Sequence, residues 1–436
     1  MNNFLSILEQ IDDVLWSYIG IYLVLLTGLY FTARSRGFQF KTLTNAPTIF
    51  KNLYKVSKDK NADGVNPFKL YFASVGGMVG LGNLAVVVTA ITAGGPGALF
   101  WLWIAAFAGM LIKYSEIYLG VKFRRYNAKE KSYDGGPMFY LKKAFNNKVL
   151  PIISCILLCI YGAEVFQFKA VSDTIAYTFG IDWFVVASLL GISILYSTMG
   201  GIRRLATICT VMMPFFLIVY VLMAAFLLII NMPAIPSLLL LIVKSAFVGH
   251  APVAGFLGST ALAAIHYGVA RAVYSGDIGI GYDSIVQSET KTIHPELQAK
   301  LAIFGQLTDA IICTCTALIV LLTGVWHDPS IKDPSLYIIK ALSTYFPYME
   351  IFISILFFVA GYTTLIAYFT VGTKCAKFIF PKVGKYIYLA YGMVAFFLTK
   401  YFDQSALLSV MSVSGGLLVL MNVSAIIKLR KHIKFK

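Results

Sequence analysis

Apolar runs of about 20 residues recur along the whole chain, and they constrain its fold more than any other feature. A run of that length lets an α-helix cross the hydrocarbon core of a bilayer. Of the 436 residues, 58% are hydrophobic and only 13% are charged, a balance that soluble domains do not have. The sequence therefore predicts an all-α polytopic membrane protein, with a single transmembrane domain over residues 1–436. We count eleven predicted spans, at 14–33, 68–92, 97–121, 149–178, 183–199, 207–231, 236–268, 301–324, 349–373, 386–401 and 405–427.

Basic residues gather in alternate loops, beginning with 34–67 and 122–148, whereas the turns at 93–96 and 232–235 have almost none. By the positive-inside rule, this pattern predicts an amino terminus outside the cell and a cytoplasmic carboxyl terminus. The clustering also explains the formal charge of +16, so we expect membrane lipid and not nucleic acid as the partner. The first apolar run lacks a basic region before it, which favours a retained helix over a signal peptide. The expected location is a cell inner (plasma) membrane.

The span at 68–92 contains the segment GGMVGLGN at residues 76–83, which is poor material for a regular helix. Glycine costs about 1 kcal/mol relative to alanine in a helix interior. A broken helix at membrane depth is tolerated where it lines a cavity or is buried in protein. Its free carbonyl groups can hold a cation and its free N–H groups a carboxylate. This segment therefore predicts a transport site for a small zwitterion and a cation.

A second predicted span is also interrupted, at residues 245–259, by Gly249, Pro252, Gly255 and Gly258. If the first helix is set aside, the two interrupted spans are the first and sixth of ten and cross the membrane in opposite directions. Matching interruptions in two halves indicate an inverted repeat. We expect repeats at 68–231 and 236–427, with the site between the two broken helices near the middle of the membrane.

The segment GGPGALFWLW at residues 94–103 resembles the signature of the alanine or glycine:cation symporter family, with Leu102 where methionine is usual. The preceding GLGN at 80–83 is similar to the family's G-T-G-N, with Leu81 in place of threonine. Further similarity covers nearly the whole chain, including 201–204, 268–271 and 275–281. The resemblance implies one amino-terminal helix followed by the five-plus-five inverted-repeat fold of sodium-coupled amino-acid transporters.

The resemblance also implies a function and a site. It implies sodium-coupled import of a small neutral amino acid, alanine or glycine, by alternating access, without a resident cofactor and with no metal beyond the transported sodium. The implied substrate-binding residues come from four spans: Gly82, Asn83, Gln167, Phe256, Gly258, Thr364 and Tyr368. The implied sodium ligands are carbonyl and hydroxyl oxygens, which hard cations prefer, of Gly76, Val79, Thr363 and Thr364.

The chain departs from the family pattern within the predicted span at 149–178. Lys169 and Glu164 stand where the family usually has asparagine. An ionisable residue inside a span is a functional hypothesis by default. One interpretation gives Lys169 or Glu164 the role of the coupling cation, which would make the protein a proton-coupled or uncoupled permease for another small amino acid or solute. The other interpretation pairs Lys169 with Asp173, one helical turn on, as a structural ion pair.

Other functions fit the sequence less well. The turn at 94–97 lacks the Lys-Ser/Thr of a phosphate-binding loop, so no nucleotide is expected. The segment GIGYD at 279–283 is close to an intramembrane aspartyl protease motif, but its aspartate is one position late, and we expect no enzyme activity. Two broken helices fit an occluded carrier site better than a continuous channel. Lys113 and Glu116, three residues apart, are expected to form a structural pair.

Overall fold

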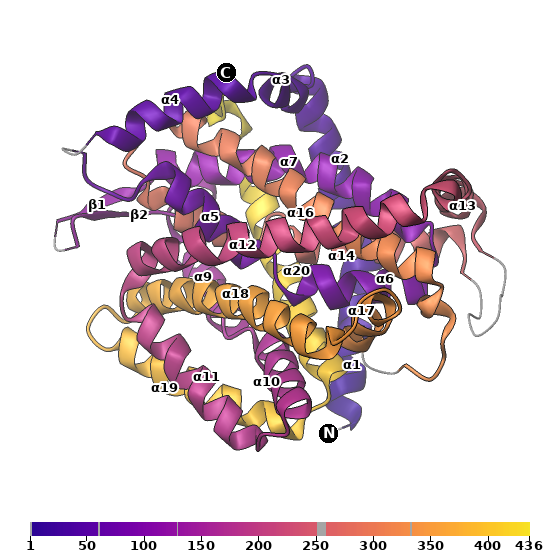
Figure 1. The fold of residues 1–436 in the computed structure, drawn as a ribbon. Coiled ribbons are helices and arrows are strands. Elements are labelled where there is room, and N and C mark those ends of the chain that lie inside the picture. Colours follow the sequence, from indigo (N-terminus) through magenta and orange to yellow (C-terminus); the bar gives the residue numbers. More distant parts are fainter. Residues whose placement is uncertain (1, 60–61, 129, 251–258, 332–333) are drawn as a thin grey trace.

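The computed structural model describes residues 2–59, 62–128, 130–250, 259–331 and 334–436, and helices make up almost all of it (Figure 1). The amino-terminal helices are α1 (Asn2–Val14), the π-helical turn η1 (Leu15–Gly20), α2 (Ile21–Arg34), α3 (Phe38–Thr44) and α4 (Ala46–Lys58). The next elements are α5 (Pro67–Met78), the π-helical turn η2 (Gly82–Val86), α6 (Val87–Gly94), α7 (Ala98–Lys122), the antiparallel strands β1 (Arg125–Asn127) and β2 (Ser132–Asp134), α8 (Pro137–Phe145), α9 (Val149–Tyr161), α10 (Val165–Phe179), α11 (Trp183–Thr198) and α12 (Gly201–Ile230). The remaining elements are η3 (Met232–Ala234), α13 (Ile235–Val248), α14 (Ala261–Ser275), α15 (Tyr282–Val286), η4 (Gln287–Glu289), α16 (Pro295–Thr323), η5 (Val325–His327), α17 (Pro334–Ser343), α18 (Met349–Ile379), α19 (Gly384–Leu398), η6 (Thr399–Tyr401), α20 (Gln404–Lys428) and η7 (Arg430–His432).

Seven helices of the described part are long and apolar enough to cross a membrane, and the bent pair α5 and η2–α6 makes an eighth. The predicted spans at 183–199 and 386–401 correspond to shorter helices of 16 and 15 residues. The protein is therefore a multi-pass, all-α membrane protein, as predicted, while the count of eleven spans stays a prediction. The seven long spans are Gln10–Arg34, Ala98–Lys122, Val149–Phe179, Gly201–Ile230, Pro295–Thr323, Met349–Ile379 and Gln404–Lys428.

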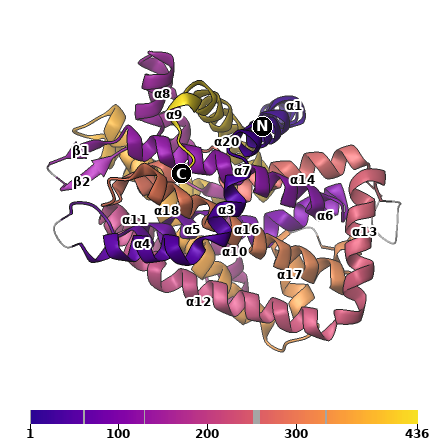
Figure 2. The ribbon, with the colours of Figure 1, turned by 90° about the horizontal axis from the view of Figure 1, so that it is seen from above.

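The central helix of the bundle is α18, which packs against α5, α9, α10 and α12. In Figure 1, α12 and α18 run side by side across the molecule, and α19 and α11 lie on the far side of α18. On the other side of the core, α7 packs against α16 and α14. Seen from above in Figure 2, α12 and α13 form the outer boundary beside α6 and α17. The broken helix α5–η2–α6 is thereby enclosed by the helices of both predicted repeats.

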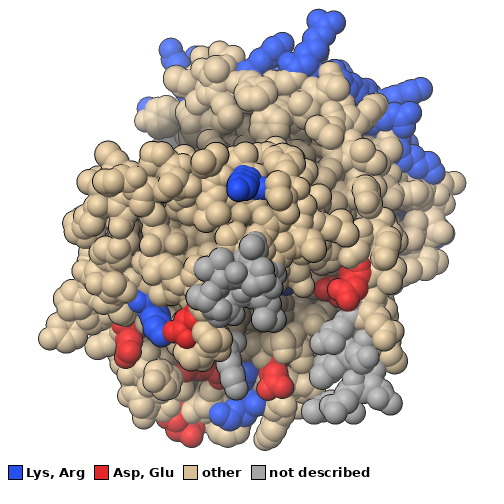
Figure 3. Space-filling model, turned by 90° about the vertical axis from the view of Figure 1, so that its right-hand side faces the viewer, with Lys and Arg blue, Asp and Glu red and all other residues tan. Residues whose placement is uncertain are grey.

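The outer face of α12 shows how the bundle meets lipid. Val211, Phe215, Ile218 and Leu222 follow one another at helical spacing, and each is exposed. A stripe of exposed apolar side chains would be costly in water but suits the hydrocarbon of a bilayer. In Figure 3, Lys and Arg gather along the upper edge of the visible face, Asp and Glu lie in its lower half, and the broad area between is mostly uncharged.

The two predicted interruptions are found where the described residues allow a test. The helix α5 ends at Met78, and the pair of helices bends by 47° before η2 begins at Gly82. The helix α13 ends at Val248, and α14 begins at Ala261. The predicted site residues Phe256 and Gly258 lie outside the described residues.

The structure also contains an interruption that the sequence did not predict. The predicted span at 149–178 consists of two helices, α9 and α10, separated by residues 162–164. Glu164 adopts the left-handed conformation, with φ of 48°, which an α-helix cannot contain. The halves also differ in part of their surroundings, because α9 packs against α8 and α10 against α11, whereas both pack against α18 and α20. The predicted span is confirmed as Val149–Phe179, whereas the break inside it was not predicted.

Candidate functional site

The unwound stretch at residues 79–81 is the centre of the candidate site. Val79 has left the helical conformation, with φ of −89° and ψ of 93°, and the whole stretch is fully buried. Buried backbone N–H groups that lose their helical partners need others. Asn83 Oδ1 accepts a hydrogen bond from the N–H of Gly80 at 3.1 Å, and Gln167 Oε1 accepts one from the N–H of Leu81 at 3.2 Å. The predicted substrate-binding residues Asn83 and Gln167 therefore stabilise the unwound conformation by accepting these hydrogen bonds.

Oxygen atoms from α18 lie against the end of α5. The hydroxyl of Thr364 donates to the carbonyl of Gly76 at 3.0 Å and also contacts the carbonyl of Ala360 at 3.2 Å. The hydroxyl of Thr363 donates to that same Ala360 carbonyl at 2.8 Å. The structure thus brings Thr364 to Gly76, beside Val79, at the carbonyl-bearing end of a helix, where cations are favoured. The Thr363 hydroxyl bonds to carbonyls of its own helix and to Met213 Sδ at 3.3 Å.

A buried aspartate that the sequence analysis did not select completes the other side of the break. Asp309 lies in the middle of α16 and is 1% exposed. Its Oδ1 accepts a hydrogen bond from Asn83 Nδ2 at 2.6 Å, and the hydroxyl of Ser275 lies 3.4 Å from its Oδ2. The available signal was its position as an acidic residue inside a predicted span, which is the type of residue that marks functional sites in membranes.

Glu164 reaches the same centre through Gln167. Gln167 Nε2 donates to Glu164 Oε2 at 3.0 Å, while the Oε1 of the same side chain binds the N–H of Leu81. Glu164 is 1% exposed and occupies the break between α9 and α10. Two interruptions of the membrane helices therefore meet at a single glutamine side chain.

Lys169 is not brought to this centre. Its ammonium lies 3.0 Å from Asp173 Oδ2, one helical turn on, and Trp183 Nε1 donates to the other oxygen of that carboxylate at 2.9 Å. The structural ion pair between Lys169 and Asp173 is confirmed. Lys169 also lines a cavity of about 520 Å³ together with Thr89 and Asp403.

Aromatic rings enclose the site on the side of α9, α14 and α15. The ring of Tyr368 stacks on that of Tyr282 with centroids 4.3 Å apart, and it lies 5.2 Å from the ring of Tyr161. A Cβ atom on Gly82 would lie 3.3 Å from the ring of Tyr274. The predicted residues Gly82 and Tyr368 thus face a wall of tyrosine rings that leaves little room beside the break.

A buried ion pair supports the inner half of α5. The Lys113 ammonium lies 2.6 Å from Asp283 Oδ2 and donates to the carbonyl of Gly276 at 2.7 Å, and Ser74 donates to the same aspartate. Glu116 instead accepts a hydrogen bond from the N–H of Ser284 at 3.3 Å. The expected Lys113–Glu116 pair was wrong, because each residue has a partner from a distant segment.

Comparison with known proteins identifies the kind of molecule that contains this site. Residues 1–435 match the sodium:alanine symporter family. The chain belongs to that family. An uncharacterized transporter of Haemophilus influenzae is 32% identical, with 98% of this chain and 94% of the relative covered. The sodium/alanine symporter AgcS of Methanococcus maripaludis is 29% identical, with 90% of this chain and 88% of the relative covered.

A solved structure agrees with the fold expected of a sodium:alanine symporter family member. The crystal structure of MhsT in complex with L-phenylalanine superposes with a TM-score of 0.58 over 82% of this chain and 89% of that chain. The identity is 14%, so this likeness concerns the fold alone. The protein is a membrane transporter of the amino-acid:cation symporter type, and the enzyme alternative is excluded by its membership of the family.

Proposed function

We propose that this member of the sodium:alanine symporter family imports a small neutral amino acid, alanine or glycine, together with sodium. The observation that carries the proposal is the buried break at residues 79–81, which has carbonyl and hydroxyl oxygen atoms on one side and amide-bearing side chains on the other. The name of the archaeal relative, a sodium/alanine symporter, supports the same cargo.

The proposed amino-acid position lies along η2. The N–H groups at the start of η2, around Gly82 and Asn83, are suited to a carboxylate because a helix amino terminus is electropositive. Gln167 supplies an amide that can turn from Leu81 to the substrate. Tyr274 and Tyr368 limit the space for the side chain of the substrate, which favours a methyl group or a hydrogen. Phe256 and Gly258 remain expectations from the sequence.

The proposed sodium position lies between α5 and α18, among the oxygens of Gly76, Val79, Thr363 and Thr364. In the described structure, the Thr364 hydroxyl spans the gap to Gly76. Sodium would take both oxygens as ligands and order the unwound stretch, which raises the affinity for the amino acid by a coupling free energy. Alternating access would follow as the repeats at 68–231 and 236–427 move against each other, in a cell inner membrane with the amino terminus outside.

The direct test is uptake of radiolabelled alanine and glycine into proteoliposomes under an imposed sodium gradient and, separately, a proton gradient. Accumulation driven by sodium is the expected result. Accumulation driven by protons alone would overturn the sodium assignment. Absence of accumulation of either amino acid under both gradients would overturn the substrate assignment, and a fixed ratio of ion to amino-acid flux distinguishes a carrier from a channel.

Substitution of Thr364 by valine tests the sodium position. Valine keeps the shape of threonine but removes the hydroxyl that contacts Gly76, so we expect the sodium concentration for half-maximal uptake to rise about tenfold or more, equivalent to about 1.4 kcal/mol. The matched control is Thr323→Val, because the Thr323 hydroxyl bonds only to carbonyls of its own helix in the described structure. An unchanged sodium dependence in Thr364→Val would contradict the proposed ligand.

A proton-coupled mechanism is the second candidate, and one observation favours it. Glu164 is a buried carboxylate in contact with Gln167, whereas Lys169 is engaged by Asp173. We expect Lys169→Asn to leave the ion dependence of uptake unchanged. Glu164→Gln keeps the hydrogen bond to Gln167 but removes the titratable group. Sodium dependence that persists with an unchanged pH profile in Glu164→Gln excludes proton coupling through this residue, whereas loss of pH dependence would favour it.

A further inference from the structure

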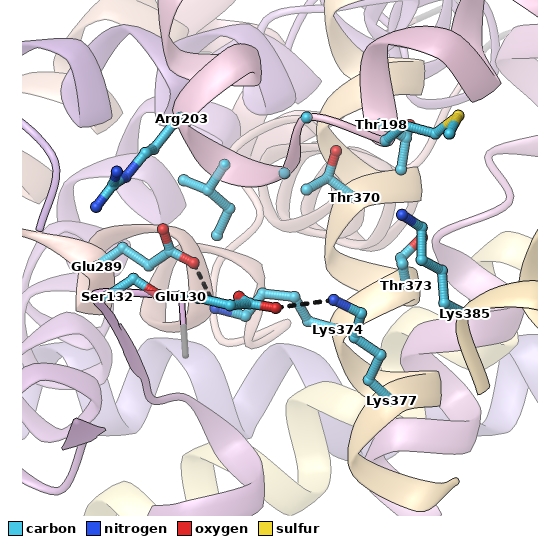
Figure 4. A pocket seen from close by; sticks show the side chains of 14 residues that line it. Glu130, Ser132, Thr198, Arg203, Glu289, Thr370, Thr373, Lys374, Lys377 and Lys385 are labelled. Carbon is cyan, nitrogen blue, oxygen red and sulfur yellow. Dashed lines mark hydrogen bonds and ion pairs between the residues drawn. The ribbon is translucent and has the colours of Figure 1, made fainter. Parts of the chain in front are cut away.

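A cavity of about 290 Å³ lies beside the last turns of α18, where α11 turns into α12 (Figure 4). Its walls come from the 198–203 turn, the end of α18, the strand β2 and η4. The cavity shares no lining residue with the candidate transport site, and we call it the basic cavity. Four cationic side chains line it: Arg203, Lys374, Lys377 and Lys385.

Two of these cations are paired with three carboxylates. Lys374 lies 2.9 Å from Asp134 and 2.5 Å from Glu289, and Lys377 lies 3.0 Å from Glu130. Burial alone raises the pKa of Asp134, but the Lys374 ammonium outweighs it and holds that pKa below its ordinary value. These ion pairs form one wall, and Figure 4 shows two of them as dashed lines.

The other two cations have no carboxylate partner among the described residues. Arg203 donates to the carbonyl of Lys131 at 2.7 Å, a contact that leaves its charge uncompensated. Lys385 takes part in no ion pair within the described ranges, and Figure 4 shows its side chain extending beside Thr373. The cavity therefore has a surplus of positive charge, in the form of donors that suit an anion.

Two buried hydroxyl groups in the walls point to a missing acceptor. Ser132 Oγ and Thr198 Oγ1 line the cavity, and both residues are 3% exposed. Neither atom has a hydrogen-bond partner in the part of the chain that the structure describes. A buried polar group without a partner costs about 1–3 kcal/mol, so such groups in native proteins normally meet a ligand or water.

The amino terminus of α12 opens into the same cavity. This helix has 30 residues and begins at Gly201, whose N–H and those that follow have no acceptor inside the helix. Gly201 has a φ of 63°, and a Cβ built on it would meet open space. A helix amino terminus of this kind favours a negatively charged group.

We propose that the basic cavity binds the phosphate monoester group of an anionic ligand. Three carboxylates against four cations leave a net positive charge, and the unpaired Arg203 and Lys385 can both donate to the oxygens of a phosphate monoester. The same oxygens can accept from both hydroxyls and from the start of α12. The positive-inside rule puts this basic end of the molecule in the cytoplasm, so the phosphate comes from a lipid headgroup of the inner leaflet or from a soluble phosphate ester.

Such a ligand would tie together parts of the chain that are far apart in sequence. Ser132 is on β2, Thr198 ends α11, and Arg203 and Lys385 lie in the first turns of α12 and α19. A ligand that binds only the folded protein raises its stability with the logarithm of ligand concentration once that concentration exceeds the Kd. The proposal therefore predicts thermal stabilisation that does not depend on amino-acid uptake.

The test is thermal unfolding of the purified full chain in detergent, followed by tryptophan fluorescence, with glycerol 3-phosphate or phosphatidic acid as the probe. We expect the Tm to rise by several degrees relative to sodium chloride of equal ionic strength. The Arg203→Gln/Lys385→Gln variant should lose this shift, while Lys382→Gln, an exposed lysine outside the cavity, should keep it. Arg203 also donates to the carbonyl of Lys131, so the double variant can fail to fold for that reason. The single variants Lys385→Gln and Thr198→Val leave this contact intact and should also reduce the shift in Tm.

The two probes distinguish the sources of the phosphate. A shift with phosphatidic acid but not with glycerol 3-phosphate assigns a lipid headgroup, and the reverse assigns a soluble ester. The proposal is overturned if neither probe shifts the Tm of the parent protein, or if the variants that lack Lys385 respond as the parent does.

Discussion

Substitution of Gly80 by alanine is expected to reduce sodium-driven amino-acid uptake about tenfold to a hundredfold. A Cβ atom at this position would lie 2.5 Å from the hydroxyl oxygen of Thr364 and 2.6 Å from Oε1 of Gln167. Cβ atoms essentially never approach other atoms so closely, so Thr364 on the proposed ion side and Gln167 on the proposed substrate side must both move. Overpacking of this kind costs about 1–3 kcal/mol, and each 1.4 kcal/mol is about tenfold in affinity.

The measurement is initial uptake in proteoliposomes as a function of both sodium and amino-acid concentration. Because one methyl group disturbs both sides, we expect both half-saturation concentrations to rise. The matched control is Gly191→Ala in α11, where the added methyl group meets the flexible end of Met393 at 3.3 Å and makes ordinary contact with the Phe396 ring at 3.8 Å. Unaltered uptake in Gly80→Ala would contradict the assignment of the break as the transport site.

Substitution of Lys113 by methionine is expected to have the largest effect on stability. The change leaves the Asp283 carboxylate without its cation. Both side chains of the pair are buried, with Lys113 0% and Asp283 1% exposed. Removal of one partner from a buried ion pair costs about 3–5 kcal/mol, which is a large fraction of the stability of a folded domain. We expect little folded protein after purification and a clearly lower Tm in detergent for what remains.

The double variant Lys113→Met/Asp283→Asn separates charge from packing. Asparagine removes the buried charge and retains an acceptor for Ser74, so the Tm should recover most of the loss. An exposed pair provides the control, since Lys340→Met, which removes the partner of Asp328, should leave the Tm unchanged. A Tm equal to that of the parent in Lys113→Met would show that the pair does not hold α5 in place.

The parts of the fold that depend on local composition could be predicted from the sequence. The glycines at 76–83 weaken a helix whatever its tertiary surroundings, so the break between α5 and η2 was predictable. The Lys169–Asp173 pair was predictable for the same reason, since residues four apart on a helix are neighbours. The resemblance to the family supplied the pairing of Thr364 with Gly76, which composition does not indicate.

The parts that the sequence analysis missed depend on contacts between distant residues. Asn83 and Asp309 are 226 positions apart, and Lys113 meets Asp283 across 170 positions, so no spacing rule joins them. The break at residues 162–164 contains a single glycine, and alanine and glutamate are both good helix formers. Glu164 leaves the helix because tertiary packing and its contact with Gln167 outweigh that local preference.

The break between α9 and α10 has a mechanical consequence. The angle between α9 and α10 can change at residues 162–164 without loss of the hydrogen bonds inside either helix. α9 packs against α8 and α10 against α11, while both helices pack against α18 and α20, so a change of angle would move α8 and α11 in different directions. The break at residues 162–164 is also connected to the unwound stretch at 79–81, because Gln167 binds both Glu164 and Leu81. A movement at one break would therefore displace the other.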